Sequence, residues 1–173
     1  MPAFTRLPRL ACFALLLAPL AAPAQAPEPA PQSSFRPDLF FAGRTRGAGT
    51  IVTAMSSRPK QLSVEGVGSI APDGLMTLDQ AVTIDGKSSL RRFAIRRVSA
   101  NAWQGTLSDA QGPVRGEVVG NNLRLHYRLK DRGMLMNQLL TLQPGGRTLR
   151  NRGVVTLYGM RVARIDETIE KLD

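Results

Sequence analysis

Strict alternation of apolar and polar residues is the feature that most constrains what this chain can fold into. Residues 123–130 read Leu-Arg-Leu-His-Tyr-Arg-Leu-Lys, so every second side chain is apolar. Side chains of a β-strand point alternately to its two faces, and the pattern therefore predicts a strand with one buried and one solvated face. That division is typical of an antiparallel sheet. The preceding Gly120-Asn121-Asn122 predicts a hairpin turn, because Gly and Asn tolerate positive φ.

Similar short segments, separated by turn residues, extend over the rest of the chain. In residues 75–84, for example, Met76, Leu78, Val82 and Ile84 share one face. Residues 135–142 are too evenly apolar to define a face. The other predicted strands are residues 50–54, 61–70, 90–98, 102–107, 114–118 and 147–158, and the predicted turns are 56–59, 71–74, 85–86, 109–113 and 144–146, with Asn101 ending one strand.

About nine strands at roughly 8–12-residue spacing are typical of a β-sandwich or a β-barrel. Consecutive hairpins favour the barrel, because sequential closure removes exposed sheet edges. We therefore predict an all-β, antiparallel up-and-down meander that closes into a barrel of about 8–10 strands, wide enough to hold one small ligand. Two segments are candidates for a short helix, 38–42 and 165–172, and the second equally suits a closing strand.

The N-terminal segment has the order of a secretory signal peptide. Arg6 and Arg9 precede an apolar run at 10–20, and small residues follow it. The run is too short for a transmembrane helix, which needs about 20 apolar residues. Cys12 lies inside the run rather than just after it, which disfavours a lipid anchor. We expect an exported protein, periplasmic or envelope-associated, and soluble rather than lipid-anchored.

The predicted signal peptide divides the chain into three parts. Residues 1–24 are the predicted signal peptide, since cleavage after Ala24 satisfies the small-x-small rule; cleavage after Ala26 is the alternative. Residues 25–34 are a Pro-rich flexible leader that cannot pack a core. Residues 35–173 are a single domain without cysteine, so an ordinary core rather than disulfides must stabilise it.

Basic residues cluster on the predicted outer faces of two strands. The formal net charge is +10, and loss of the signal lowers it to +8. Such clusters attract anionic surfaces, although general solubilising charge is the plainer interpretation. Nucleic acid is not expected, because export separates the chain from it and few aromatic residues interleave. The candidate contacts to an anionic surface are Arg92, Arg96, Arg124, Arg128 and Lys130.

Several residues are candidates for contact with a ligand inside the barrel. Arg91 and Arg97 share the inward parity of Phe93, so they either reach water at the strand ends or meet an acidic headgroup in a cavity. Methionines near residue 135 either line an adaptable apolar cavity or fill a core. The candidate ligand-binding residues are Arg91, Phe93, Arg97, Trp103, Tyr127, Met134 and Met136.

No signature of catalysis, metal binding or a cofactor is found in the sequence. His126 is the single histidine, and a metal site needs three or four ligands. It is interpreted as a solvated surface residue rather than a general base. The acidic residues mostly lie at predicted turns, where capping explains them. The chain is therefore not predicted to be an enzyme, and no cofactor or metal is expected.

Six short stretches form a series of landmarks along the chain: Phe40-Phe-Ala-Gly-Arg44, Gly47-x-Gly49, Leu75-Met-Thr-Leu78, Trp103-Gln-Gly-Thr106, Gly116-Glu-Val-Val-Gly-Asn-Asn-Leu123 and Tyr158-Gly-Met-Arg-Val-Ala163. Their order resembles the bacterial envelope family known as domain of unknown function 3833. The resemblance covers nearly all of the chain after the signal and implies a lipocalin-like barrel at the cell envelope. Many members of that family resemble lipoproteins, whereas this chain lacks a lipobox. The family has no established catalytic residues.

Together these observations predict an exported, non-catalytic binding protein. Its expected partner is an apolar or amphipathic small molecule or lipid, or an anionic component of the envelope. The alternative is an accessory or assembly protein of the envelope that acts through protein–protein contacts.

Overall fold

The computed structural model describes residues 35–173. The predicted signal peptide (1–24, with the alternative end at 26) and the leader (25–34) lie outside the described residues and stay predictions. None of the described helices is long and apolar enough to cross a membrane.

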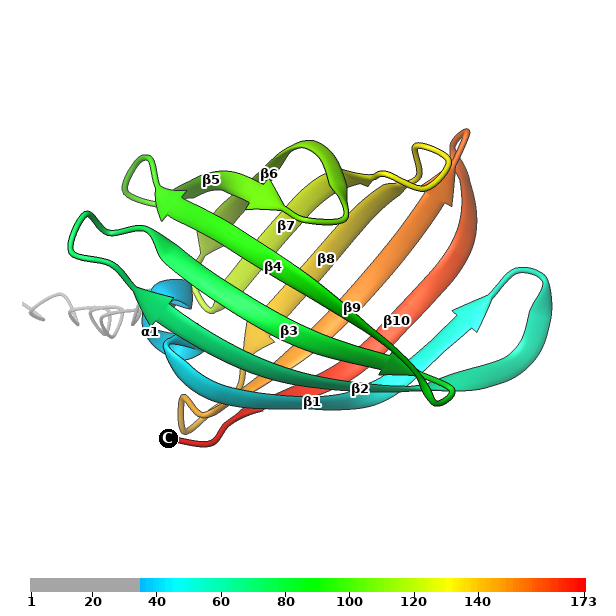
Figure 1. The fold of residues 1–173 in the computed structure, drawn as a ribbon, viewed down its shortest axis with the longest axis horizontal. Coiled ribbons are helices and arrows are strands. Elements are labelled where there is room, and N and C mark those ends of the chain that lie inside the picture. The colour runs from blue at the N-terminus through cyan, green and yellow to red at the C-terminus, as the bar shows by residue number, and fades with distance from the viewer. Residues whose placement is uncertain (1–34) are drawn as a thin grey trace, which may run out of the picture. The chain divides into compact units, whose positions relative to one another are not determined.

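Ten antiparallel strands form a closed barrel in which each strand pairs with its neighbours along the chain (Figure 1). The last strand pairs with the first, in a register that runs from Thr45 opposite Lys171 to Thr53 opposite Ala163. This topology confirms the predicted up-and-down meander. The elements are α1 (Pro37–Phe41), β1 (Gly43–Thr53), β2 (Ser56–Ile70), β3 (Met76–Ile84), β4 (Lys87–Arg97), β5 (Ala102–Leu107), β6 (Ala110–Val119), β7 (Asn122–Leu129), β8 (Leu135–Leu142), β9 (Thr148–Leu157) and β10 (Met160–Lys171).

The structure settles the two helix candidates differently. The first is the short helix α1, in agreement with the sequence. The second lies within β10, because its backbone is hydrogen-bonded to β9 on one edge and to β1 on the other. Barrel closure thus selects the extended form of a segment whose spacing also suits a helix.

Two further details of the sequence prediction are wrong. Residues 56–59 are not a turn, since β2 already begins at Ser56. Pro59 is tolerated there because the β1–β2 register is irregular between Ile51 and Thr53, where a missing backbone donor costs little. Lys130 lies just beyond the end of β7 rather than on the strand.

The face of β8 that the sequence left undefined is clear in the structure. Met136, Gln138 and Leu140 are buried, and Asn137 between them is exposed. The same alternation on every strand directs one set of side chains into the barrel. Tyr127, Met76, Leu123, Leu149 and Val114 are the largest hydrophobic side chains that this interior buries completely.

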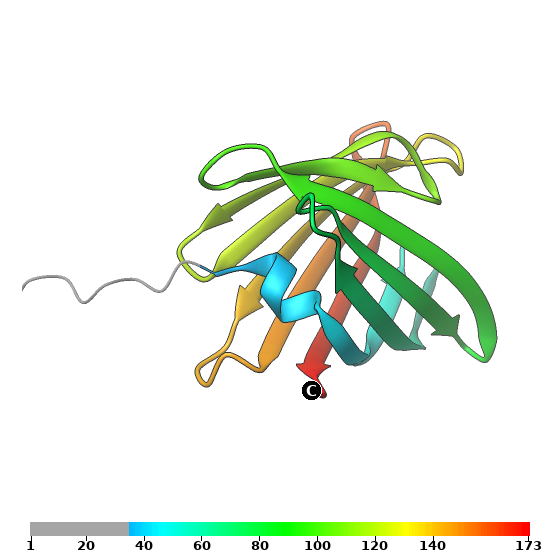
Figure 2. The same ribbon diagram turned by 60° about the vertical axis from the view of Figure 1, so that its left-hand side comes forward.

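Helix α1 lies at the barrel end where β1, β3 and β9 begin (Figure 2). Phe40 and Phe41 are buried, with ring centroids 5.1 Å apart in an edge-to-face contact. Lys171 Nζ donates hydrogen bonds to the carbonyl oxygens of Phe40 and Ala42, which ties the helix to the last strand. A Cβ on Gly68 would lie 1.9 Å from the Phe41 carbonyl oxygen, so only glycine lets the helix approach β2 this closely.

Truncation of the packed interior should destabilise the barrel strongly. Leu149 is 0% exposed, and Leu149→Ala is expected to lower the free energy of unfolding by about 2–5 kcal/mol, because it removes buried methyl groups and leaves a cavity. Leu90→Ala is the matched control, since Leu90 is 86% exposed and its truncation should change that free energy by less than about 0.5 kcal/mol. Urea unfolding of the two variants measures both values. Equal losses would contradict the assignment of inner and outer faces.

Candidate ligand site in the barrel interior

Besides the buried threonine Thr45 of β1, polar side chains interrupt the apolar interior on five strands. Four are buried: Gln80, Gln138, Asn151 and Glu167. The fifth, Arg91, is half-buried and lies directly opposite Gln80 in the β3–β4 register. Asn151 lies directly opposite Glu167 in the β9–β10 register. We call these five residues the polar belt.

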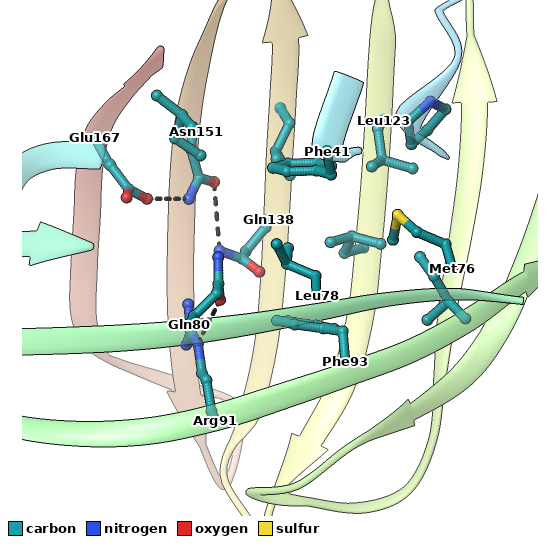
Figure 3. A pocket seen from close by; sticks show the side chains of 15 residues that line it. Phe41, Met76, Leu78, Gln80, Arg91, Phe93, Leu123, Gln138, Asn151 and Glu167 are labelled. Atoms are coloured by element: carbon teal, nitrogen blue, oxygen red, sulfur yellow. Dashed lines mark hydrogen bonds between the residues drawn. The ribbon is translucent and has the colours of Figure 1, made fainter. Parts of the chain in front are cut away.

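Hydrogen bonds join one half of the polar belt to Tyr127. Tyr127 Oη donates to Gln138 Oε1 at 3.1 Å. Gln138 Nε2 donates to Asn151 Oδ1 at 3.4 Å, and Asn151 Nδ2 donates to Glu167 Oε2 at 2.8 Å (Figure 3). Burial raises the pKa of Tyr127 to about 12, so its hydroxyl keeps its proton and remains a donor at neutral pH.

Arg91 and Gln80 form the other half of the belt. Arg91 Nε donates to Gln80 Oε1 at 2.8 Å (Figure 3). The guanidinium carbon lies 5.6 Å from the centroid of the Phe93 ring, within the range of a cation–π contact. The hydrogen bonds and ion pairs of residues 35–173 do not include the two terminal amino groups of Arg91, so both remain available to a ligand or to water.

Glu167 has one carboxyl oxygen with no partner. The residue is 4% exposed. Within residues 35–173, Oε1 is the only solvent-inaccessible side-chain oxygen or nitrogen that lacks a hydrogen bond. Gly47 makes room for it, because a Cβ at that position would lie 2.0 Å from Oε1. Burial raises the pKa of Glu167, and the Asn151 hydrogen bond and the charge of Arg91 oppose that shift. The carboxyl therefore holds its proton to higher pH than an exposed glutamate.

Two cavities meet at the polar belt. A small one of about 40 Å³ lies between the belt and α1, with Phe41, Leu78 and Leu123 in its wall. A larger one of about 210 Å³ extends from the belt toward the opposite barrel end. Belt residues Arg91, Gln138, Asn151 and Glu167 line both.

The larger cavity has an apolar wall and a polar floor. Its wall includes Ile51, Leu62, Val64, Val82, Ile84, Leu129, Met136, Val155, Ala163 and Ile165, and Asp109 lies at the edge. An apolar cavity of about 150 Å³ can hold benzene, whereas pockets for drug-sized ligands usually exceed about 300 Å³. The cavity is thus large enough for a small molecule or for one end of a longer amphiphile.

Four of the seven predicted ligand contacts line the two cavities or hydrogen-bond to the polar belt. Arg91 and Met136 line the larger cavity, Phe93 lines the smaller one, and Tyr127 hydrogen-bonds to the belt. For Arg91, this placement corresponds to the cavity alternative rather than the strand end.

The other three predicted contacts lie elsewhere. Trp103 is packed in the core at 4% exposure, and Met134 packs against the core just before β8. Arg97 is exposed at the end of β4, where its Nε donates to the carbonyl oxygens of Ser99 and Ala100 at 3.0 Å. The strand-end alternative therefore describes Arg97.

The five predicted surface cations do not form one patch. Arg92 pairs with Asp79 at 2.5 Å, and Arg96 pairs with Asp73 at 3.1 Å, so carboxylates offset both charges on β4. Strands β5 and β6 separate them from the cations of β7. The remaining three, Arg124, Arg128 and Lys130, are exposed; Arg128 and Lys130 donate to the carbonyl oxygens of Gly133 and Ser108.

His126 lies on the outer face of β7. It is exposed, and its Nδ1 lies 2.7 Å from Asn137 Oδ1. Within residues 35–173, no group of three His, Cys, Asp or Glu side chains is arranged to hold a metal ion.

Four belt residues were missed by the sequence analysis: Gln80, Gln138, Asn151 and Glu167. The signal that could have found them is a polar residue at an inward position of an alternating strand. Gln80, for example, falls between Leu78 and Val82 on the predicted apolar face of β3. One such residue on a single strand is unremarkable. The pattern becomes visible only when the strands are aligned by the position of each residue along the barrel axis, which places these polar residues at one level.

The fold and its interior define a closed, ten-stranded meander barrel with a polar layer across an apolar core. The chain belongs to the family described as "Protein of unknown function (DUF3833)", whose sequence model matches residues 15–171. No curated protein sequence matches the chain.

Solved structures with similar folds share little sequence with this chain. The S-type phycobiliprotein lyase CPES from Guillardia theta superposes with a TM-score of 0.61 at 8% identity, over 79% of this chain and 90% of that one. A protein of unknown function from the DUF3598 family of Nostoc punctiforme gives a TM-score of 0.59 at 13% identity, over 80% of this chain and 50% of that one. At such identities the similarity establishes the barrel fold alone.

The burial of Glu167 should make stability depend on pH. Above the ordinary carboxyl pKa the unfolded chain releases this proton, but the folded chain keeps it until its own raised pKa is reached. The free energy of unfolding should therefore fall as pH rises through that window. Glu167→Gln should flatten this decline and stabilise the protein at neutral pH, whereas Glu170→Gln, at an exposed position of the same strand, should not. Urea unfolding across the pH range measures the effect, and an unchanged slope in Glu167→Gln would refute it.

Proposed function

We propose that this protein binds an amphipathic small molecule in the larger barrel cavity without transforming it. One observation carries the proposal: an apolar cavity of about 210 Å³ has a floor of polar groups with unused hydrogen-bonding capacity. Apolar walls favour an alkyl or ring moiety, and convergent polar groups orient a head group. This combination suits a ligand with one end of each kind.

The energetics of the polar belt support a binding role over a purely structural one. A polar group buried in a core costs free energy unless its hydrogen bonds are satisfied. In the belt, Glu167 Oε1 is unsatisfied, and Arg91 uses one of its three nitrogens in hydrogen bonds to the described residues. Apolar residues at these positions would have made a more stable core. The polar belt therefore has the properties of a binding site whose free hydrogen-bonding groups a ligand would satisfy.

The location of this activity is part of the proposal. The arrangement of basic, apolar and small residues in 1–24 supports export, which would place the barrel in the periplasm or at the envelope. Amphipathic molecules are abundant at a membrane surface, and an exported barrel of this kind would encounter them there.

A second candidate function is contact with an anionic surface of the envelope. Arg124 and Arg152 are exposed on β7 and β9, with Leu139 of β8 between them in register. Neither arginine forms an ion pair within the part of the chain that the structure describes. Unpaired cations on two strands that only β8 separates favour an anionic partner, in contrast to the paired Arg92 and Arg96.

Filling the larger cavity should abolish binding of a small amphiphile. Octanol is a suitable neutral probe, and calorimetric titration measures its affinity. Val64→Phe adds bulk to the cavity wall and should weaken octanol binding about tenfold or more. Val67→Phe makes the same change at a 61% exposed position of the same strand and should leave the affinity unchanged.

Thermal unfolding of each variant serves as the folding control for this experiment. If Val64→Phe does not fold, Ala163→Phe at the half-buried end of the same cavity replaces it. No octanol binding by the wild-type protein, or equal binding by the folded variants, would overturn the proposed function.

A further inference from the structure

Arg91 is the single cation of the cavity floor. Its guanidinium is charged at every relevant pH and has two terminal amino groups without a partner among residues 35–173. Glu167 of the belt and Asp109 at the edge of the cavity are the acidic residues of its lining, and no ion pair within 4.0 Å joins Arg91 to either of them. Arg91 therefore brings an uncompensated positive charge to the edge of an apolar cavity, where an unpaired charge is costly.

Hydrogen-bond donors outnumber free acceptors in the polar belt. Each terminal amide nitrogen carries two N–H groups, yet Gln138 Nε2 and Asn151 Nδ2 make one hydrogen bond each. Gln80 Nε2 makes none within the described residues, and its Oε1 is already used by Arg91. The one belt oxygen without any hydrogen bond is Glu167 Oε1. A group that fits this floor must accept several hydrogen bonds.

The charge and the excess of donors point to the same head group. An ionised carboxylate accepts up to about four hydrogen bonds and binds a guanidinium through two parallel ones. A single cation matches a single negative charge, whereas a dianionic phosphate would leave one charge unpaired. A cationic head group would face Arg91 and meet like-charge repulsion.

The shape of the cavity sets the orientation of the ligand. Gln80 at the belt and Ile84 at the end of β3 are four residues apart, which spans about 13 Å along the strand and less along the axis of a tilted barrel. This length is lined by apolar side chains such as Val82 and Ile165. A ligand with its carboxylate at the belt would therefore direct a medium-length alkyl chain toward the opposite barrel end.

We propose that the barrel binds a carboxylate amphiphile, with its head group held by Arg91 at the polar belt and its alkyl chain in the larger cavity. The proposal rests on the proposed function and names the class of ligand for the same site. Gln138 and Asn151, which line the same cavity, would supply further N–H donors to the carboxylate.

Probes that differ in the head group alone test this assignment. Octanoate, octanol, octyl phosphate and octylammonium share one alkyl chain, and calorimetry gives the affinity of each. Octanoate should bind most tightly and octylammonium least tightly. Arg91→Met should weaken octanoate binding by about tenfold or more and octanol binding much less, because only the ionised head group loses a charge-assisted hydrogen-bond pair. Arg92→Met, at the next residue on the outer face, should change neither affinity.

The outcomes separate the two proposals. Octanol binding that depends on the cavity, together with octanoate binding that Arg91→Met leaves unchanged, would overturn the head-group assignment and retain the proposed function. Tighter binding of octylammonium or octyl phosphate than of octanoate would also overturn the assignment. Failure of every octyl probe to bind would overturn both. Thermal unfolding of Arg91→Met shows whether the variant is folded.

Glu167 provides a second test through pH. The groups around its carboxyl are Asn151 of β9, Gln138 of β8, Arg91 of β4 and Tyr127 of β7, while β1 and β2 present Gly47 and Val64. Asp109 lies at the edge of the same cavity. Loss of the Glu167 proton places a second negative charge beside the bound carboxylate.

Octanoate affinity should therefore fall as pH rises through the raised pKa of Glu167, at pH values where the probe itself stays ionised. Glu167→Gln should remove this decline, and octanol affinity should show none. An octanoate affinity that increases with pH would contradict a carboxylate beside Glu167.

Discussion

Closure of the barrel between β1 and β10 is the constraint on which the remaining structure depends. The ladder from Thr45–Lys171 to Thr53–Ala163 leaves no free sheet edge and separates an inside from an outside. Every inward side chain must then pack or find a partner within the barrel. The polar groups of the belt cost free energy only because the closed sheet shields them from bulk water at the sides of the barrel.

Inside the barrel, hydrogen bonds within the polar belt offset part of the free energy that burying its polar groups costs. The chain from Tyr127 through Gln138 and Asn151 to Glu167 satisfies most of the buried polar atoms on one side. Arg91 and Gln80 satisfy each other in part on the other side. The groups left over are the two terminal amino groups of Arg91, which lines both cavities, and one carboxyl oxygen of Glu167, which lies against Gly47. A layer built for stability alone would not leave its most polar atoms in this state.

The fold could be predicted from the sequence to a large extent, but the site could not. Alternation and turn residues were sufficient for the antiparallel meander, and the inward parity of Arg91, Phe93 and Tyr127 was correct. The turn expected at 56–59 failed because Pro59 is compatible with an irregular strand pair, which local composition does not reveal. Gln80 and Glu167 were missed because each is a single polar residue on an otherwise apolar face.

On the alternating strands, the sequence by itself determined which side chains face the interior, because a strand has a period of two and that period is a local property; on β8, which is evenly apolar, it did not. It also determined that residues 35–173 contain no cysteine and carry an excess of arginine. Only the tertiary structure decided the depth at which each inward residue lies, because depth depends on the register between strands. Register is what sets Asn151 opposite Glu167 and Arg91 opposite Gln80, and barrel closure is what brings those two pairs, far apart in the chain, to one cavity floor.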